Sequence, residues 1–216
     1  MYIFILMAIV SCSVRQSNYC LIIHLLSIIV AANKVWPGTF TLADFMMKHR
    51  DRFLQCSILE LGAATGCLSI YLTMMLHPHN TSLVTSDIDD GGEVEANVKY
   101  NFLRNGLLEP IHVPYTWGNR WPNDIIPSSS FRYIVASDIL LYVKAYPQLV
   151  QSLVALFDGG TVMEFIMSWQ RRIADSIQFF DLMKLSNFIC YHHGNCVYSF
   201  FRKHHEAEIM HSYGVG

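Results

Sequence analysis

The chain carries little charge for its length, and this scarcity limits the kind of protein it is. Charged residues make up 15% of its 216 residues and hydrophobic residues 52%, whereas a typical soluble domain is roughly 25% charged. This composition excludes a disordered chain and a coiled coil. Fifteen Lys and Arg against 17 Asp and Glu leave a formal net charge of −2, so we expect no direct nucleic-acid binding.

Long hydrophobic runs are also missing. Two apolar runs stand out, residues 2–10 and 21–32, and neither reaches the roughly 18 residues of a membrane-spanning helix. The first run resembles the core of a signal peptide, but no Lys or Arg precedes it, and a buried strand or helix is the favoured interpretation. Residues 1–33 are therefore a hydrophobic segment of uncertain role, and membrane contact is expected only through them, if at all.

The cysteines lack the spacing of a disulfide framework or of a zinc site. Six are present, and a chain of this size does not need disulfides to be stable. Cys190, His192, His193 and Cys196 lie close together in the sequence, but ligands so crowded suit a tetrahedral ion poorly. We expect a structural hairpin there and no metal site.

From Cys56 onward, short apolar runs alternate with longer amphipathic stretches, which predicts alternating strands and helices. The expected strands are 57–61, 82–86, 111–113, 131–137, 161–168, 188–192 and 197–201, and the expected helices are 67–76, 93–105, 146–157 and 173–185. This alternation favours an α/β fold with a mostly parallel sheet and helices on both faces. The last two strands have no helix between them and should form an antiparallel hairpin at the sheet edge.

The loop after the first of these strands points to a ligand. Residues 60–66 read Glu-Leu-Gly-Ala-Ala-Thr-Gly, and glycines there let the backbone approach a ligand closely. A dinucleotide fingerprint would need glycine where Ala64 and Cys67 stand, and Glu60 would repel a pyrophosphate. Asp87, which ends the second strand, is placed to accept hydrogen bonds from ribose hydroxyls. A nucleoside with a positive charge and no phosphates describes S-adenosylmethionine; the alternative is a glycine turn with a helix-capping Asp.

Five segments occur in the order expected of a known family: 35–38, 58–66, 116–118, 136–142 and 168–172. Together they resemble methyltransferase family 16, lysine methyltransferase-like enzymes related to methyltransferase-like protein 23, in a plant-type form. The resemblance covers about residues 34–203 and implies a Rossmann-like, seven-stranded S-adenosylmethionine-dependent methyltransferase domain there. Residues 204–216 would follow as a polar tail.

The resemblance also implies roles for single residues. Trp36 would pack against the cofactor S-adenosylmethionine, Asp87 would hold its ribose, and Trp117 would flank its adenine. Asp138 would face the substrate amine, and Tyr142 would wall the methyl-transfer channel, which makes these two the catalytic residues. The other residues implied to bind the cofactor are Glu60, Gly62, Ala63, Ala64 and Ser137.

Methyl transfer requires few chemical groups beyond the residues named above. Methyl transfer is an in-line displacement, so catalysis is mainly positioning. A lysine amine, with a pKa of about 10.4 in water, must first lose its proton, and an apolar aromatic channel favours this by desolvation. No nucleophilic residue of the protein and no metal is required.

Other aromatic and charged residues have two interpretations each. Trp121 and Trp169 are interpreted as core or surface-groove aromatics as readily as functional residues. Arg171 and Arg172 are interpreted as the solvated start of a helix, with substrate contact as the alternative. The histidines of the tail at 204–216 are interpreted as solvated.

Three departures from the family pattern keep alternatives open. Ala64 stands where the family usually has glycine, Leu141 occupies its aromatic position with Tyr142 following, and residues 1–33 do not resemble its polar N-terminal hairpin. The leading hypothesis is a protein lysine N-methyltransferase. The alternatives are a non-catalytic binding protein with the same fold, and a methyltransferase acting on arginine or a small molecule. A protein substrate, a monomer and a cytoplasmic or nuclear location are expected.

Overall fold

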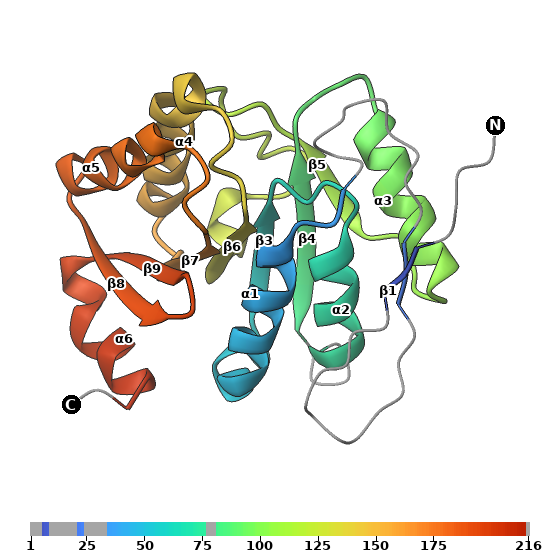
Figure 1. Cartoon of the computed structure of the whole chain (residues 1–216), viewed down its shortest axis with the longest axis horizontal. Helices are drawn as coiled ribbons and strands as arrows, with labels where there is room; N and C mark the ends of the chain where they lie inside the picture. Colours follow the sequence, from blue (N-terminus) through green and yellow to red (C-terminus); the bar gives the residue numbers. More distant parts are fainter. Residues whose placement is uncertain (1–5, 9–20, 24–33, 77–80, 215–216) are drawn as a thin grey trace.

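A computed structural model describes residues 6–8, 21–23, 34–76 and 81–214. Its main body is a sheet of seven strands with helices on both faces (Figure 1). The strands are β3 (Ser57–Leu61), β4 (Ser82–Asp87), β5 (Ile111–Pro114), β6 (Tyr133–Ser137), β7 (Glu164–Ser168), β8 (Phe188–Gly194) and β9 (Val197–Arg202). The helices are α1 (Pro37–Lys48), α2 (Cys67–Leu76), α3 (Glu93–Arg104), α4 (Tyr146–Asp158), α5 (Gln178–Leu185) and α6 (Glu206–Ser212). Short 3₁₀ turns are η1 (Arg50–Phe53), η3 (Ser128–Ser130), η4 (Val143–Ala145), η5 (Ala174–Ile177) and η6 (Lys203–His205).

The strand order is β5-β4-β3-β6-β7-β9-β8. Neighbours from β5 to β7 run parallel, and β9 pairs antiparallel with both β7 and β8. The predicted fold class, a mostly parallel sheet with an antiparallel hairpin, is confirmed. Strand order reverses between β3 and β6, which is where open α/β sheets bind ligands at the carboxyl ends of their strands.

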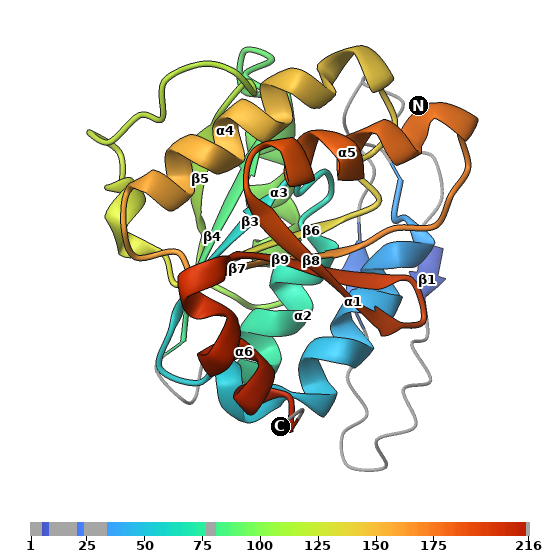
Figure 2. The same ribbon diagram turned by 90° about the vertical axis from the view of Figure 1, so that its left-hand side faces the viewer.

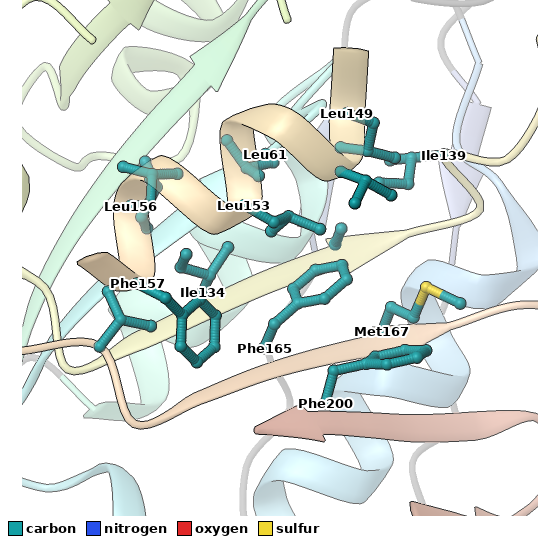
Figure 3. Packing of buried hydrophobic residues seen from close by; sticks show 14 of the residues in the cluster. Leu61, Ile134, Ile139, Leu149, Leu153, Leu156, Phe157, Phe165, Met167 and Phe200 are labelled. Carbon is teal, nitrogen blue, oxygen red and sulfur yellow. The ribbon is translucent and has the colours of Figure 1, made fainter. Parts of the chain in front are cut away.

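Alternate residues of the central strands enter two hydrophobic cores, one on each face of the sheet. Ile134 of β6 packs in the core covered by α4 and α5, whereas Tyr133 and Val135 belong to the core covered by α1 and α2. Figure 2 shows these two helix pairs on opposite sides of the sheet, and Figure 3 shows Leu153 of α4 above Ile134 and Phe165. The strands are buried on both faces, which explains their nearly continuous apolar sequences.

The last predicted helix needed correction. The helix expected over 173–185 is divided into η5 and α5. The Ser176 hydroxyl donates to the carbonyl of Ile173 at 2.6 Å, a local bond that competes with regular α-helix. Trp121 and Trp169 both lie in the core under α4 and α5, 5% and 7% exposed, which agrees with their interpretation as core aromatics.

The stretch predicted as a solvated polar tail is instead folded into η6 and α6. Ile209 is 1% exposed, and the Tyr213 hydroxyl donates to Oε1 of buried Glu164 at 2.7 Å. Arg52 completes this group, with Nη2 2.6 Å from Glu164 Oε2 and its guanidinium carbon 3.7 Å from the centroid of the Tyr213 ring. The sequence pattern did not reveal this helix, because single residues, Ile209 and Tyr213, attach it to the rest of the fold and no apolar run marks it.

Within the hydrophobic segment 1–33, two short strands are described. β1 (Leu6–Ala8) pairs antiparallel with β2 (Leu21–Ile23), and β2 lies against α3. The rest of that segment, including Cys12, Cys20 and most of the run that resembles a signal-peptide core, lies outside the described residues. None of the helices in the described ranges is long and apolar enough to span a membrane. A targeting or anchoring role for 1–33 stays a prediction.

Candidate functional site

A cavity of about 610 Å³ lies at the carboxyl ends of β3, β4, β5 and β6. Eight of the predicted site residues line it: Trp36, Gly62, Ala64, Asp87, Trp117, Ser137, Asp138 and Tyr142. Sequence reasoning did not assign its other lining residues, which are Ile88, Tyr115, Thr116, Ile139, Leu141, Lys144, Ala145 and Gln148. Four of these, Ile88, Tyr115, Thr116 and Ile139, lie within three residues of a predicted strand end, which was the signal available for them.

The other two predicted cofactor residues, Glu60 and Ala63, lie behind the cavity and not on its wall. Glu60 is 2% exposed, because the alternation along β3 turns its side chain away from the face that holds Leu59 and Leu61. Its Oε2 accepts hydrogen bonds from the backbone N–H and the hydroxyl of Ser69 in α2, at 3.2 and 2.5 Å. Glu60 thus fixes the first turn of α2, and contact with a cofactor stays a prediction.

Burial shifts the pKa of the Glu60 carboxyl. Desolvation raises the pKa of Glu60 to about 8, against the opposing effect of the two Ser69 donors, and the Asp87 charge raises it further. Two carboxyls therefore flank the glycine loop after β3, one behind it and one at the end of β4. Asp87 lines the cavity, so its carboxylate makes this corner unfavourable for phosphate and favourable for a cation. Glu60, with a pKa of about 8, is mostly neutral near pH 7 and contributes little charge.

Asp87 is held in place by two backbone amides. Its Oδ2 accepts from the N–H of Ala64 at 2.7 Å and its Oδ1 from the N–H of Ile88 at 2.8 Å. Burial raises the pKa of Asp87, and these two hydrogen bonds oppose that shift. The bond to Ala64 joins the end of β4 to the loop after β3, so the carboxylate and the loop form one rigid unit.

The loop between β3 and α2 needs left-handed backbone at two positions that face the cavity. Gly62 has φ +70°, and a Cβ there would lie 2.8 Å from Cγ2 of Ile139. Ala64 has φ +52°, a conformation that costs a residue with a side chain roughly 1–2 kcal/mol. The alanine that departs from the family pattern therefore keeps the loop geometry at the expense of backbone strain.

Asp138 connects the cavity to the start of α1. Its Oδ2 accepts from the backbone N–H of Gly38 at 2.7 Å and from Nη2 of Arg172 at 2.9 Å. The Ser168 hydroxyl donates to the Gly38 carbonyl at 2.7 Å. A Cβ at Gly38 would lie 2.6 to 2.8 Å from Ser168 Oγ and the Asp138 carboxylate, so only glycine allows this approach. The contacts fix α1 and, two residues earlier, Trp36 at the cavity wall.

Trp36 also has cations beside it. The guanidinium carbon of Arg172 and Nζ of Lys34 each lie 4.9 Å from the centroid of its ring, within cation–π distance. Arg172, interpreted from the sequence as a solvated helix start, therefore bridges Asp138 and Trp36. Tyr142 is 63% exposed at the cavity mouth, whereas Trp117 is half-buried.

The lining residues fit a positively charged nucleoside. Most of the cavity wall is apolar, Asp87 offers carboxylate oxygens, and Trp117 offers a ring face. The loop from Gly62 to Gly66 contains no Lys or Arg to pair with a phosphate. Across the described ranges, no group of three or more His, Cys, Asp or Glu is arranged to hold a metal ion. These features match S-adenosylmethionine and not a dinucleotide.

The domain is a Rossmann-like methyltransferase domain of the S-adenosylmethionine-dependent class. Three features define it: the order of the strands in the sheet, the glycine loop after β3 and the acidic residue that ends β4. The ribosomal protein L11 methylase of Lactobacillus delbrueckii subsp. bulgaricus shares the fold, with a TM-score of 0.51 and 17% identity over 77% of this chain and 78% of that one. The sequence profile of the lysine methyltransferase family matches residues 20–186. This chain belongs to that family. The match begins within the hydrophobic segment and ends before β8.

Individual relatives match over shorter stretches. Methyltransferase-like protein 22 of Mus musculus is 30% identical over 39% of this chain and 25% of its own length. Protein N-lysine methyltransferase METTL21A of Danio rerio is 27% identical over 60% of this chain and 57% of its own length. The matched region thus spans between a quarter and about three fifths of these two proteins.

Proposed function

We propose that this protein transfers a methyl group from S-adenosylmethionine to a lysine side chain of a protein. One observation carries the proposal: a single cavity at the sheet switch point joins Asp87 and Trp117 to Trp36, Asp138 and Tyr142, in a chain of the lysine methyltransferase family. The zebrafish relative is named a protein N-lysine methyltransferase, which supports a protein lysine as the acceptor.

Residues at the β3, β4 and β5 ends of the cavity would hold the cofactor. S-adenosylmethionine, when bound, supplies a methyl group on a positively charged sulfur. Asp87 has one backbone N–H on each oxygen, which leaves lone pairs for ribose hydroxyls. Trp117 would cover the adenine. Gly62, Ala64 and Ser137 would face the methionine portion.

The β6 side of the cavity would receive the acceptor lysine. Trp36, Leu141 and Tyr142 provide apolar and aromatic surface there, and desolvation by such surface lowers the pKa of an amine. Asp138 would have two roles. Its carboxylate anchors α1 through Gly38, and it would also orient the amine of the acceptor lysine. Substrate positioning, and not a covalent step on the protein, would supply the rate enhancement.

Titration calorimetry with S-adenosylhomocysteine tests the cofactor assignment. The wild-type protein should bind, and Asp87→Ala should weaken binding by roughly 1–3 kcal/mol through lost ribose hydrogen bonds. Asp89→Ala removes an exposed carboxylate outside the cavity lining and should leave the affinity unchanged. No binding by the wild-type protein at millimolar ligand would overturn the proposal.

A labelling experiment tests the acceptor. Cell extract incubated with the protein and S-adenosylmethionine carrying a labelled methyl group should yield a labelled protein, and mass spectrometry of that protein should locate the methyl group on lysine. Methylated arginine, or label only in small molecules, would contradict the assignment of the acceptor while leaving the cofactor assignment intact.

A further inference from the structure

Building on the proposed function, we infer that the acceptor lysine lies in an acidic segment of its protein. The cavity lining contains three charged side chains, those of Asp87, Asp138 and Lys144. Both carboxylates already accept hydrogen bonds from the protein itself. Lys144, in η4 beside Tyr142, is exposed. Asp138 is paired with Arg172 and Asp87 is assigned to the cofactor ribose, so Lys144 is the charged lining residue left for an arriving peptide.

Two further cations stand beside Trp36, another lining residue. Arg172 neutralises Asp138 through the 2.9 Å ion pair, and Lys34 lies near the same ring as Arg172. Neither Lys34 nor Lys144 forms an ion pair with any part of the chain that the structure describes. Both lysines are free to meet carboxylates of a bound peptide. We call Lys34, Lys144 and Arg172 together the basic rim.

An exposed carboxylate also occurs near this side of the molecule. Asp175 of η5 lies close enough to Tyr146 to contribute to the raised pKa of its hydroxyl, after the larger effect of burial. It forms no ion pair with Lys144 among the described contacts. Asp175 therefore leaves Lys144 without an ion-pair partner in the described part of the chain.

A basic rim suits the proposed chemistry as well as recognition. Cations near an amine favour its neutral form, which is the form that accepts a methyl group. Carboxylates flanking the acceptor lysine would pair with the rim lysines, whereas flanking Lys or Arg would be repelled. The rim thus selects acidic surroundings.

A nucleic acid is the less favourable occupant. Sequence-independent binding to a phosphate backbone depends on many simultaneous cation contacts, and this chain has a formal net charge of −2. Three rim cations around an aromatic pocket match a short peptide with a few carboxylates. RNA is therefore included in the test as a competitor.

Fluorescence anisotropy with labelled 13-residue peptides tests the inference on the full chain, with and without saturating S-adenosylhomocysteine. Each peptide carries one central lysine flanked by Glu, Ser or Arg. The Glu peptide should bind about tenfold tighter than the Ser peptide at low salt, the Arg peptide should bind weakest, and added salt should shrink these differences.

Matched variants test whether Lys144 causes the preference for the Glu peptide. Lys144→Glu should reduce the preference for Glu over Ser about fivefold, and Lys144→Gln should have an intermediate effect. Lys203→Glu makes the same charge change after β9, which runs antiparallel to β7, so it lies at the opposite edge of the sheet from the cavity. This control should keep the wild-type preference, and thermal unfolding checks that each variant folds.

The outcomes separate this inference from the proposed function. Equal affinity for the three peptides, tighter binding of a single-stranded RNA than of the Glu peptide, or equal effects of Lys144→Glu and Lys203→Glu would overturn the acidic-segment inference alone. Failure to bind S-adenosylhomocysteine would overturn the proposed function, while the peptide preference measured without that ligand still decides the charge question.

Discussion

Gly38 and Asp138 lie 100 residues apart in the chain, and the backbone N–H of Gly38 donates a 2.7 Å hydrogen bond to Oδ2 of Asp138. The bond ties the first helix of the methyltransferase domain to the end of β6. Because Asp138 also lines the cavity, the residue that anchors α1 is the residue predicted to meet the substrate amine. The anchoring of α1 and the predicted contact with the substrate amine therefore fall on the same carboxylate.

Substitution of Asp138 distinguishes these two duties. Asp138→Ala leaves the Gly38 N–H without its acceptor, so the free energy of unfolding should fall by about 1–3 kcal/mol. Asp138→Asn keeps a side-chain oxygen for that N–H and should preserve most of the stability. If Asp138 also orients the amine, methylation by Asp138→Asn should fall about a hundredfold. Denaturant unfolding and methylation rates check this, and full activity of Asp138→Asn would show that Asp138 is an anchor only.

Ala64→Gly should stabilise the protein. Ala64 has φ +52°, and relief of this strain, about 1 kcal/mol or more, outweighs the roughly 0.4–1 kcal/mol gained by the more flexible unfolded chain. Ala63→Gly is the matched control, because Ala63 is buried and its φ is not positive, so it should only lose stability. Denaturant unfolding measures both, and a loss of equal size in the two variants would contradict the strain assigned to Ala64.

Glu60 makes stability depend on pH. Its pKa in the folded protein is raised to about 8 from an ordinary value of 4.5, so the folded state holds a proton that the unfolded state releases. Its contribution is fully present below about pH 4.5 and is lost as pH rises toward 8. Glu60→Gln keeps an oxygen for the Ser69 donors and removes the titration.

Unfolding measured at pH 5 and pH 8 checks this pH dependence. Relative to Glu60→Gln, the wild-type protein should lose on the order of 1–3 kcal/mol between the two pH values. Parallel stability curves for the two proteins would show that Glu60 does not titrate in this window.

Tyr213→Phe should weaken the attachment of α6. The Tyr213 hydroxyl donates to Glu164, which is fully buried, and removal of a donor to a buried carboxylate costs about 1–3 kcal/mol. Tyr191→Phe serves as the control, since the Tyr191 hydroxyl makes no hydrogen bond with the described part of the chain. Denaturant unfolding should show a clear loss for the first variant and almost none for the second.

The sequence predicted those elements best that are buried on both faces. β3 and α2 were predicted with the observed bounds, because a short, mostly apolar run stopped by Gly62 and a second apolar stretch after it leave little freedom there. Asp87 was recognised because it ends a strand of a parallel sheet, whose strand ends must meet at one edge. Asp138 was recognised only through the family resemblance.

Other features depend on contacts between distant residues, which local patterns do not reveal. The Arg172 bridge joins the loop after β7 to Trp36, and α6 is held by Tyr213 through Glu164. The alternation of β3 directs the Glu60 side chain toward α2, a placement that its position in the motif did not reveal. Its contact with the cofactor stays a prediction.

Both ends of α1 are held by residues that are synthesised much later. Asp138 holds its start, and the Tyr213 ring packs against its last turns, with centroids 5.9 Å from Phe45 and 5.1 Å from His49. A nascent chain emerging from the ribosome can pair β3 with β4 early, since those strands are close in sequence. Trp36 cannot reach its position at the cavity wall until β6 has emerged. Both ends of α1 are fixed only after α6 has also emerged. The site is thus among the last parts of the molecule to be assembled during translation.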